Sequence, residues 1–130
     1  MVRFSLIAAF TAVAAVAIAP LQAATVHPFS AAAFEAAQKL GRPILVDVYA
    51  DWCPVCRAQN EVLSRLLPGR EFKNLTVFKL NFDTQKDARS RLGAQRQSTL
   101  IVFRGNKELG RSVAVTDSAS IERLVRSGLR

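Results

Sequence analysis

The chain has 130 residues, half of them hydrophobic, a formal net charge of +8 at pH 7 and two cysteines. Its lysines and arginines form no tight block and are not interleaved with aromatic residues, so we expect no nucleic-acid partner. A basic surface of this kind favours acidic partners or an anionic membrane face. The length suits one small domain and is too short for two.

Residues 1–23 have the composition of a secretory signal peptide. A lone Arg3 precedes an apolar run over residues 4–19, and a helix-ending Pro20 is followed by Leu21-Gln22-Ala23 before Ala24. The apolar run is shorter than a membrane-spanning helix usually needs. We expect cleavage after Ala23 or one residue later, a domain over residues 24–130, and a periplasmic or secreted location. An uncleaved N-terminal membrane anchor is the alternative.

Helix signals begin early in the remaining chain. A first helix is expected from Phe29 to Leu40, because Ser30 can cap it, Phe29 and Phe34 can form a hydrophobic staple, and Gly41 suits a left-handed C-terminal residue. His27, before this helix, is expected to be a surface residue and not a catalytic base.

The later elements follow from their periodicity and turn residues. They are a buried strand at Ile44–Tyr49, a helix after Cys53 that ends at Pro68-Gly69-Arg70, a strand at Leu75–Phe82, a short polar helix at Thr84–Leu92, a strand at Thr99–Phe103, an edge strand at Leu109–Val115, and a last helix capped by Asp117.

The two cysteines lie where the first strand ends and the next helix begins. Cys53 is expected at the helix N-terminus and Cys56 one turn into the helix. Unpaired backbone N–H groups and the helix dipole favour a thiolate there, so we expect Cys53 to attack and Cys56 to resolve. A disulfide that closes so short a ring gains little loop entropy, which makes the pair a better redox switch than a structural staple.

The segment Val46-Asp47-Val48-Tyr49-Ala50-Asp51-Trp52-Cys53-Pro54-Val55-Cys56 resembles the active site of the thioredoxin superfamily. It has a tryptophan before the first cysteine, an acid six residues upstream of that cysteine, and a strand leading in. The resemblance implies an α/β, thioredoxin-like fold, with a central mixed β-sheet flanked by helices. It also implies that Asp47 is a buried carboxylate that helps to move the proton of the resolving thiol. Lys79 is either a partner of Asp47, as in the family, or a lysine that leaves the sheet for solvent.

The sequence departs from the family pattern before the Thr99 strand. Thioredoxins carry a cis-proline where Ser98 stands, facing the dithiol. A cis bond before a non-proline residue costs about 2.5 to 4 kcal/mol, so we expect the bond between Gln97 and Ser98 to be trans. Arg96 and Gln97 predict a polar, cationic groove beside Cys53. The candidate substrate-contact residues are Trp52, Pro54, Gln97, Ser98 and Thr99.

These patterns favour an exported thiol-disulfide oxidoreductase that acts on protein partners, more as a reductant or isomerase than as an oxidant. Asp47 and Trp52 match the reducing members of the superfamily, and the histidine that strongly oxidising members carry between the cysteines is absent. The dithiol carries the electrons, so no organic cofactor is expected. We expect a monomer that exchanges disulfides with exported protein thiols and is recharged by a membrane electron donor.

The alternative is a metal or iron-sulfur binding module that uses the same two cysteines. The superfamily's proline is thought to exclude such ligands, and Ser98 replaces it. Two thiolates do not fill a four-ligand site, and after residue 23 the chain offers no methionine and only His27 as a further ligand of the kind that copper carriers use. No metal ligand set is therefore assigned.

Overall fold

A five-stranded mixed sheet forms the centre of residues 23–130, the part of the chain that the computed structural model describes. The elements in order are β1 (Thr25–Pro28), α1 (Ala31–Lys39), β2 (Pro43–Tyr49), α2 (Pro54–Leu66), a 3-10 turn η1 (Arg70–Phe72), β3 (Thr76–Asn81), α3 (Lys86–Arg91), β4 (Thr99–Arg104), β5 (Lys107–Val113) and α4 (Ser118–Ser127). The expected signal peptide lies outside the described residues, apart from Ala23. No helix within residues 23–130 is long and apolar enough to cross a bilayer.

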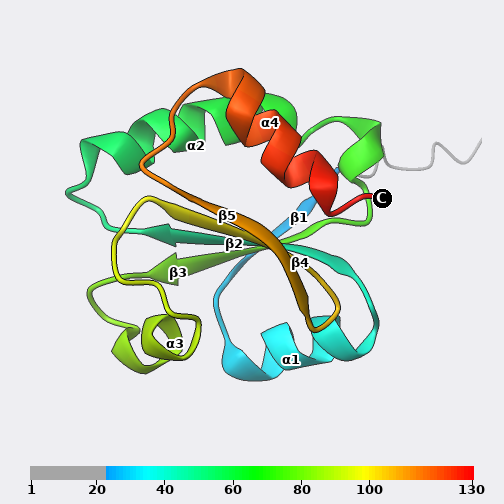
Figure 1. Cartoon of the computed structure of the whole chain (residues 1–130), viewed down its shortest axis with the longest axis horizontal. Helices are drawn as coiled ribbons and strands as arrows, with labels where there is room; N and C mark the ends of the chain where they lie inside the picture. Colours follow the sequence, from blue (N-terminus) through cyan, green and yellow to red (C-terminus); the bar gives the residue numbers. More distant parts are fainter. Residues whose placement is uncertain (1–22) are drawn as a thin grey trace, which may run out of the picture.

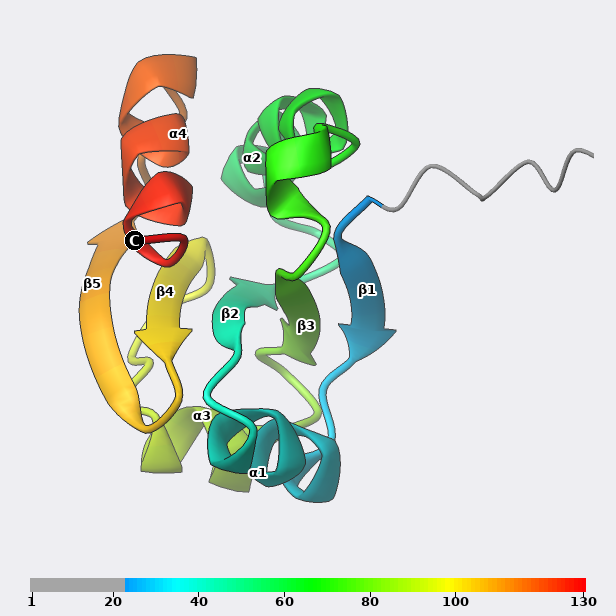
Figure 2. The ribbon, with the colours of Figure 1, turned by 90° about the vertical axis from the view of Figure 1, so that its right-hand side faces the viewer.

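The strand order is β1-β3-β2-β4-β5, with β1, β3 and β2 parallel and the pairs β2-β4 and β4-β5 antiparallel. Helices α1 and α3 cover one face of the sheet, and α2 and α4 cover the other (Figures 1 and 2). This architecture confirms the predicted mixed sheet flanked by helices. It also puts β2, which leads to the cysteines, in the middle of the sheet.

β1 was not expected from the sequence, which placed a helix as the first element. All four of its residues are exposed, and it contains a proline, so it shows neither alternation nor a buried run. Its strand conformation comes from pairing with β3, in register from Thr25 opposite Thr76 to Pro28 opposite Lys79. His27 is exposed on this edge strand, as predicted.

The start of α1 agrees with the sequence signals. Ser30 Oγ accepts a hydrogen bond from Ala33 N at 3.3 Å, and the rings of Phe29 and Phe34 lie 5.5 Å apart, which is the expected staple. Gly41 has a φ of +67°, a left-handed conformation that favours glycine.

The alternation of β2 divides the core between the two faces of the sheet. Ile44, Val46 and Val48 pack in the cluster beneath α1 and α3. Leu45 packs in the cluster beneath α2 and α4. Asp47 has the same parity as Leu45, so its carboxyl lies on the α2 face, the side that carries the cysteines.

We predict that Phe34→Ala lowers the free energy of unfolding by about 3 to 5 kcal/mol, the usual loss for a buried phenylalanine. Its ring lies 5.3 Å from that of Phe103 and 5.9 Å from that of Phe78, and these contacts disappear with it. Urea unfolding measures the change. The exposed neighbour Glu35→Ala is the matched control and should change stability by less than about 0.5 kcal/mol. Equal losses in the two variants would contradict the packing described.

Candidate active site

Cys53 is the N-cap residue of α2. Its backbone is extended, with φ of −85° and ψ of 110°, and Pro54 occupies the first helical position, where a missing N–H costs nothing. Cys53 Sγ accepts a hydrogen bond from Cys56 N at 3.1 Å. The two cysteines therefore lie as predicted, at the end of a central strand and within the first turn of a helix.

Both thiols are free and buried. Cys53 is 1% exposed and Cys56 is 7% exposed. They pack with Ala50 and with the partly buried side chains of Tyr49, Val55 and Phe82. Exposure therefore does not distinguish the attacking thiol from the resolving thiol.

The two thiols differ in the direction in which the protein shifts their pKa values. Burial raises the pKa of Cys53, but hydrogen bonds from the Cys56 thiol, the Cys56 backbone N–H and the Ser98 hydroxyl outweigh it, so its pKa lies below the ordinary value. Burial raises the pKa of Cys56, and the hydrogen bond with Cys53 raises it further. Cys53 is therefore the thiol that ionises more easily, which agrees with the attacking role expected from the sequence.

Asp47 and Lys79 form an ion pair between neighbouring strands. They stand opposite each other in the β2-β3 register, and Lys79 Nζ lies 2.5 Å from Asp47 Oδ2. Lys79 also donates to Asn60 Oδ1 at 3.4 Å and lies 5.0 Å from the centre of the Tyr49 ring. Of the two interpretations of Lys79, the structure supports the partner of Asp47.

The carboxyl of this pair is hard to ionise. The Asp47 side chain is 4% exposed, against 27% for Lys79. Burial raises the pKa of Asp47 by more than the charge and hydrogen bond of Lys79 lower it. A carboxyl with a raised pKa can accept and return a proton near neutral pH more readily than an ordinary aspartate.

A cavity of about 280 Å³ lies beside the ion pair, between β1 and α2. Asp47, Lys79 and Asn60 contribute polar groups to it, and Val26 and Leu63 are among its apolar walls. It has room for water molecules and several polar groups to bind them. The buried carboxyl therefore has space for the water that proton exchange with solvent needs.

Ser98 occupies the position beside the dithiol. The peptide bond that precedes it is trans, as expected, and Ser98 has a φ of +58°. Its Oγ lies 3.8 Å from Cys53 Sγ, and the residue is buried. Thr99, also buried, donates from Oγ1 to Arg96 O at 2.7 Å and closes this turn.

The remaining candidate contact residues surround the dithiol on the surface. Trp52 is 58% exposed, and its Nε1 donates to Asp83 Oδ2 at 2.9 Å. Pro54 is exposed and Gln97 is partly buried. Arg96, beside Gln97, is exposed and adds a positive charge to the segment before Ser98.

Two residues of the site were not found as functional candidates from the sequence. Asp83 fixes the Trp52 side chain, and nothing in the sequence marked that contact over 31 residues. Gln59 lies on the buried face of α2 and donates to the backbone carbonyl of Ser98. A glutamine among the apolar residues of a helix face was the available signal.

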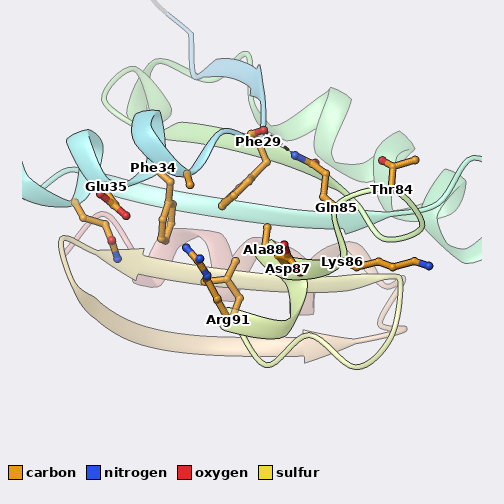
Figure 3. A pocket seen from close by; sticks show the side chains of 12 residues that line it. Phe29, Phe34, Glu35, Thr84, Gln85, Lys86, Asp87, Ala88 and Arg91 are labelled. Carbon is orange, nitrogen blue, oxygen red and sulfur yellow. Dashed lines mark hydrogen bonds between the residues drawn. The ribbon is translucent and has the colours of Figure 1, made fainter.

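A cavity of about 490 Å³ lies elsewhere, between α1 and α3 (Figure 3). Phe29, Phe34 and Ala88 are among its apolar lining residues, and Glu35 and Arg91 are among its charged ones. It lies on the face of the sheet opposite the Asp47–Lys79 pair and contains neither cysteine, so it is separate from the dithiol site.

A two-residue spacing between cysteines at a strand-to-helix junction, on a sheet of this order, defines a dithiol oxidoreductase of the thioredoxin fold. The family model described as Thioredoxin matches residues 25–127, and the chain belongs to the thioredoxin family. As a thioredoxin homologue with both cysteines present, it is a thiol-disulfide oxidoreductase.

The relatives include thioredoxins from two bacteria. The chain is 34% identical over 82 residues to thioredoxin from Chlamydia muridarum, which covers 63% of this chain and 78% of the relative. It is 32% identical over 89 residues to thioredoxin from Alicyclobacillus acidocaldarius, with coverage of 68% and 84%. The crystal structure of Trxlp from Edwardsiella tarda superposes with a TM-score of 0.74 at 48% identity, covering 77% of this chain and 98% of that one.

We predict that Asp47→Asn raises the free energy of unfolding at neutral pH. Because the pKa of Asp47 is raised above 3.8 in the folded state, this carboxyl contributes stability that is complete below pH 3.8 and is lost as the pH rises through the raised pKa. Asparagine does not ionise and avoids the loss, which is about 1.4 kcal/mol for each unit of the upward shift. Urea unfolding at neutral pH and at low pH measures the effect.

The gain should disappear at low pH, where Asp47 is protonated in the wild type. Lys79→Met is the matched control, because it removes the ammonium that favours the ionised carboxylate and should lower stability at neutral pH. Equal stability of the Asp47→Asn variant and the wild type at neutral pH would contradict the raised pKa.

Proposed function

We propose that this protein is an exported reductant that transfers electrons from Cys53 and Cys56 to disulfides of exported proteins. The observation that carries the proposal is the hydrogen bond from Cys56 N to Cys53 Sγ at 3.1 Å, which helps to lower the pKa of Cys53, whereas burial raises the pKa of Cys56. A nucleophile that is ionised and a resolving thiol that stays protonated are what a two-step reduction requires.

In the first step the Cys53 thiolate attacks one sulfur of the partner's disulfide. That S–S bond breaks, a mixed disulfide forms, and the partner's other sulfur leaves as a thiolate that takes up a proton. In the second step Cys56 loses its proton and attacks Cys53 Sγ, which releases the partner's second thiol. The products are a reduced partner and a Cys53–Cys56 disulfide, so two electrons have moved to the partner.

Asp47 is the proposed proton acceptor for Cys56. It lies on the face of the sheet that α2 covers, its pKa is raised, and the neighbouring cavity has room for water to carry the proton. Lys79 stabilises the ionised carboxylate and so assists the release of that proton to solvent. These roles match those that the family resemblance implies.

The direction of electron flow is proposed from what surrounds Cys53. Its thiolate accepts hydrogen bonds from neutral groups, and Pro54 and Val55 place no charge between the cysteines. A strongly stabilised thiolate makes a strong oxidant, as in members of this class near −120 mV, so neutral donors favour the reducing direction. Isomerisation uses the same first step and differs only in which thiol resolves the mixed disulfide.

Export is proposed from the composition of residues 1–23. The folded elements begin with β1 at Thr25, so cleavage after Ala23 would leave every described strand and helix intact. The exported protein would act as a monomer and would need a membrane electron donor to reduce its disulfide again. An uncleaved anchor would tether the same domain to the membrane.

A metal-binding role remains the second candidate, and no specific observation favours it. Within residues 23–130 no group of three or more His, Cys, Asp or Glu side chains is arranged to hold a metal ion.

We predict that Cys56→Ser, produced as the full chain, accumulates mixed disulfides with partner proteins, because the resolving thiol is gone. Cys53→Ser is the matched control and should trap none. Non-reducing gels and mass spectrometry of complexes from the exported fraction identify the partners and the N-terminus of the mature chain. Trapping through Cys53→Ser would reverse the assigned roles, and complexes found only in the cytoplasm would refute export.

We predict a reduction potential closer to about −270 mV than to about −120 mV, the two ends of the range for this class. Equilibration of the domain over residues 24–130 with a glutathione series, with metal assayed on the same sample, measures it. A reduction potential near about −120 mV would instead indicate that the protein forms disulfides in its partners. Stoichiometric metal at the two cysteines would replace the enzyme proposal with the binding-module candidate.

A further inference from the structure

Gln59 is a fully buried polar side chain close to the dithiol. It lies on α2, three residues after Cys56, and is 0% exposed. Its Nε2 donates to Ser98 O at 3.1 Å and to Val115 O at 2.9 Å. Because both partners are carbonyl oxygens, only the NH₂ end of the amide can face them, and this fixes the orientation of the side chain.

The two segments that Gln59 joins are unusual in their backbone conformation. Among residues 23–130, Ser98 and Ala114 are the only non-glycine residues with positive φ, at 58° and 59°. Ala114 N also donates to Ser98 O, at 2.9 Å. Ser98 O therefore accepts two hydrogen bonds, one from Ala114 N just after β5 and one from Gln59 Nε2 on α2. Residues in this conformation persist only where the surroundings over-determine them.

Burial of Gln59 is not explained by packing alone. Its Oε1 is buried and has no hydrogen-bond partner among the described protein atoms. An apolar side chain of the same length would fill this position without leaving a polar atom unsatisfied. What only the amide provides is the pair of hydrogen bonds to the Ser98 and Val115 carbonyls.

We propose that Gln59 is a positioning residue for the dithiol. It holds the backbone of Ser98 so that the Ser98 hydroxyl stays directed at Cys53 Sγ, 3.8 Å away, and donates to the thiolate. Serine lacks the ring that fixes φ in proline, so the conformation of Ser98 depends on its hydrogen bonds, of which Gln59 supplies the one from α2. The inference rests on the proposed role of Cys53 as the attacking thiol.

The test is a double-mutant cycle between Gln59→Met and Ser98→Ala. Methionine keeps the length of the side chain and removes both donors, and alanine removes only the hydroxyl. The readout is the pH dependence of iodoacetamide alkylation of the reduced protein, with the modified cysteine identified by mass spectrometry. Val62→Ala is the matched control, since Val62 is buried on the same helix but packs in the cluster beneath α2 and α4.

Gln59→Met and Ser98→Ala should each shift the Cys53 titration to higher pH and slow its alkylation at neutral pH by about threefold or more, because a hydrogen bond to a charged acceptor is lost. The double variant should differ from Ser98→Ala by less than about a factor of two, since both changes remove the same hydrogen bond. Val62→Ala should lower the thermal midpoint and leave the Cys53 titration unchanged.

A Gln59→Met variant that loses stability but titrates as the wild type would overturn the proposal and leave Gln59 a structural residue. Additive shifts in the double variant would also overturn it, since Gln59 would then act without Ser98. Gln59→Leu replaces Gln59→Met if the methionine variant does not fold. A different result would refute the proposed function and not the role of Gln59. If Cys56 were alkylated before Cys53 in the wild type, Cys53 would not be the attacking thiol.

Discussion

The hydrogen bond from Cys56 N to Cys53 Sγ is the interaction on which the rest of the site depends. It exists because a buried central strand ends at Tyr49 and a helix begins at Pro54, so that an orphan N–H of the first turn faces the sulfur of the N-cap residue. The same contact satisfies the helix and stabilises a thiolate. The ease with which Cys53 forms a thiolate thus depends on the backbone geometry at the N-terminus of α2.

Strand register is the second constraint. Because side chains alternate along β2, Asp47 reaches the α2 face only if the pairing with β3 and β4 is kept, and the same pairing puts Lys79 opposite it. A slip of one residue would bury the carboxyl among the phenylalanines beneath α1 and α3. The two hydrophobic clusters that fix this register therefore also locate the proton acceptor proposed for Cys56.

The sequence predicted most of the fold and the central residues of the site, because these depend on local patterns. The β-branched run of β2, the helical period after Cys53 and the cap at Ser30 each act within a few residues. β1 could not be predicted, since its four exposed residues form a strand only by pairing with β3, some fifty residues away. The hydrogen bonds of Gln59 and Asp83 and the left-handed conformation of Ser98 depend on contacts between distant segments. Of these features, the sequence shows only that a glutamine lies among the apolar residues of a helix face.

The near-complete enclosure of both sulfurs has a kinetic consequence. Exposure is one of the factors that set how fast a thiol is oxidised, so a small, freely diffusing oxidant reaches a cysteine that is 1% or 7% exposed more slowly than it reaches an exposed one. A disulfide of a protein partner has to reach the same sulfur, so exchange requires the side chains around Cys53 to move when the partner docks. Burial of the thiols thus favours exchange with a docked partner over accidental oxidation.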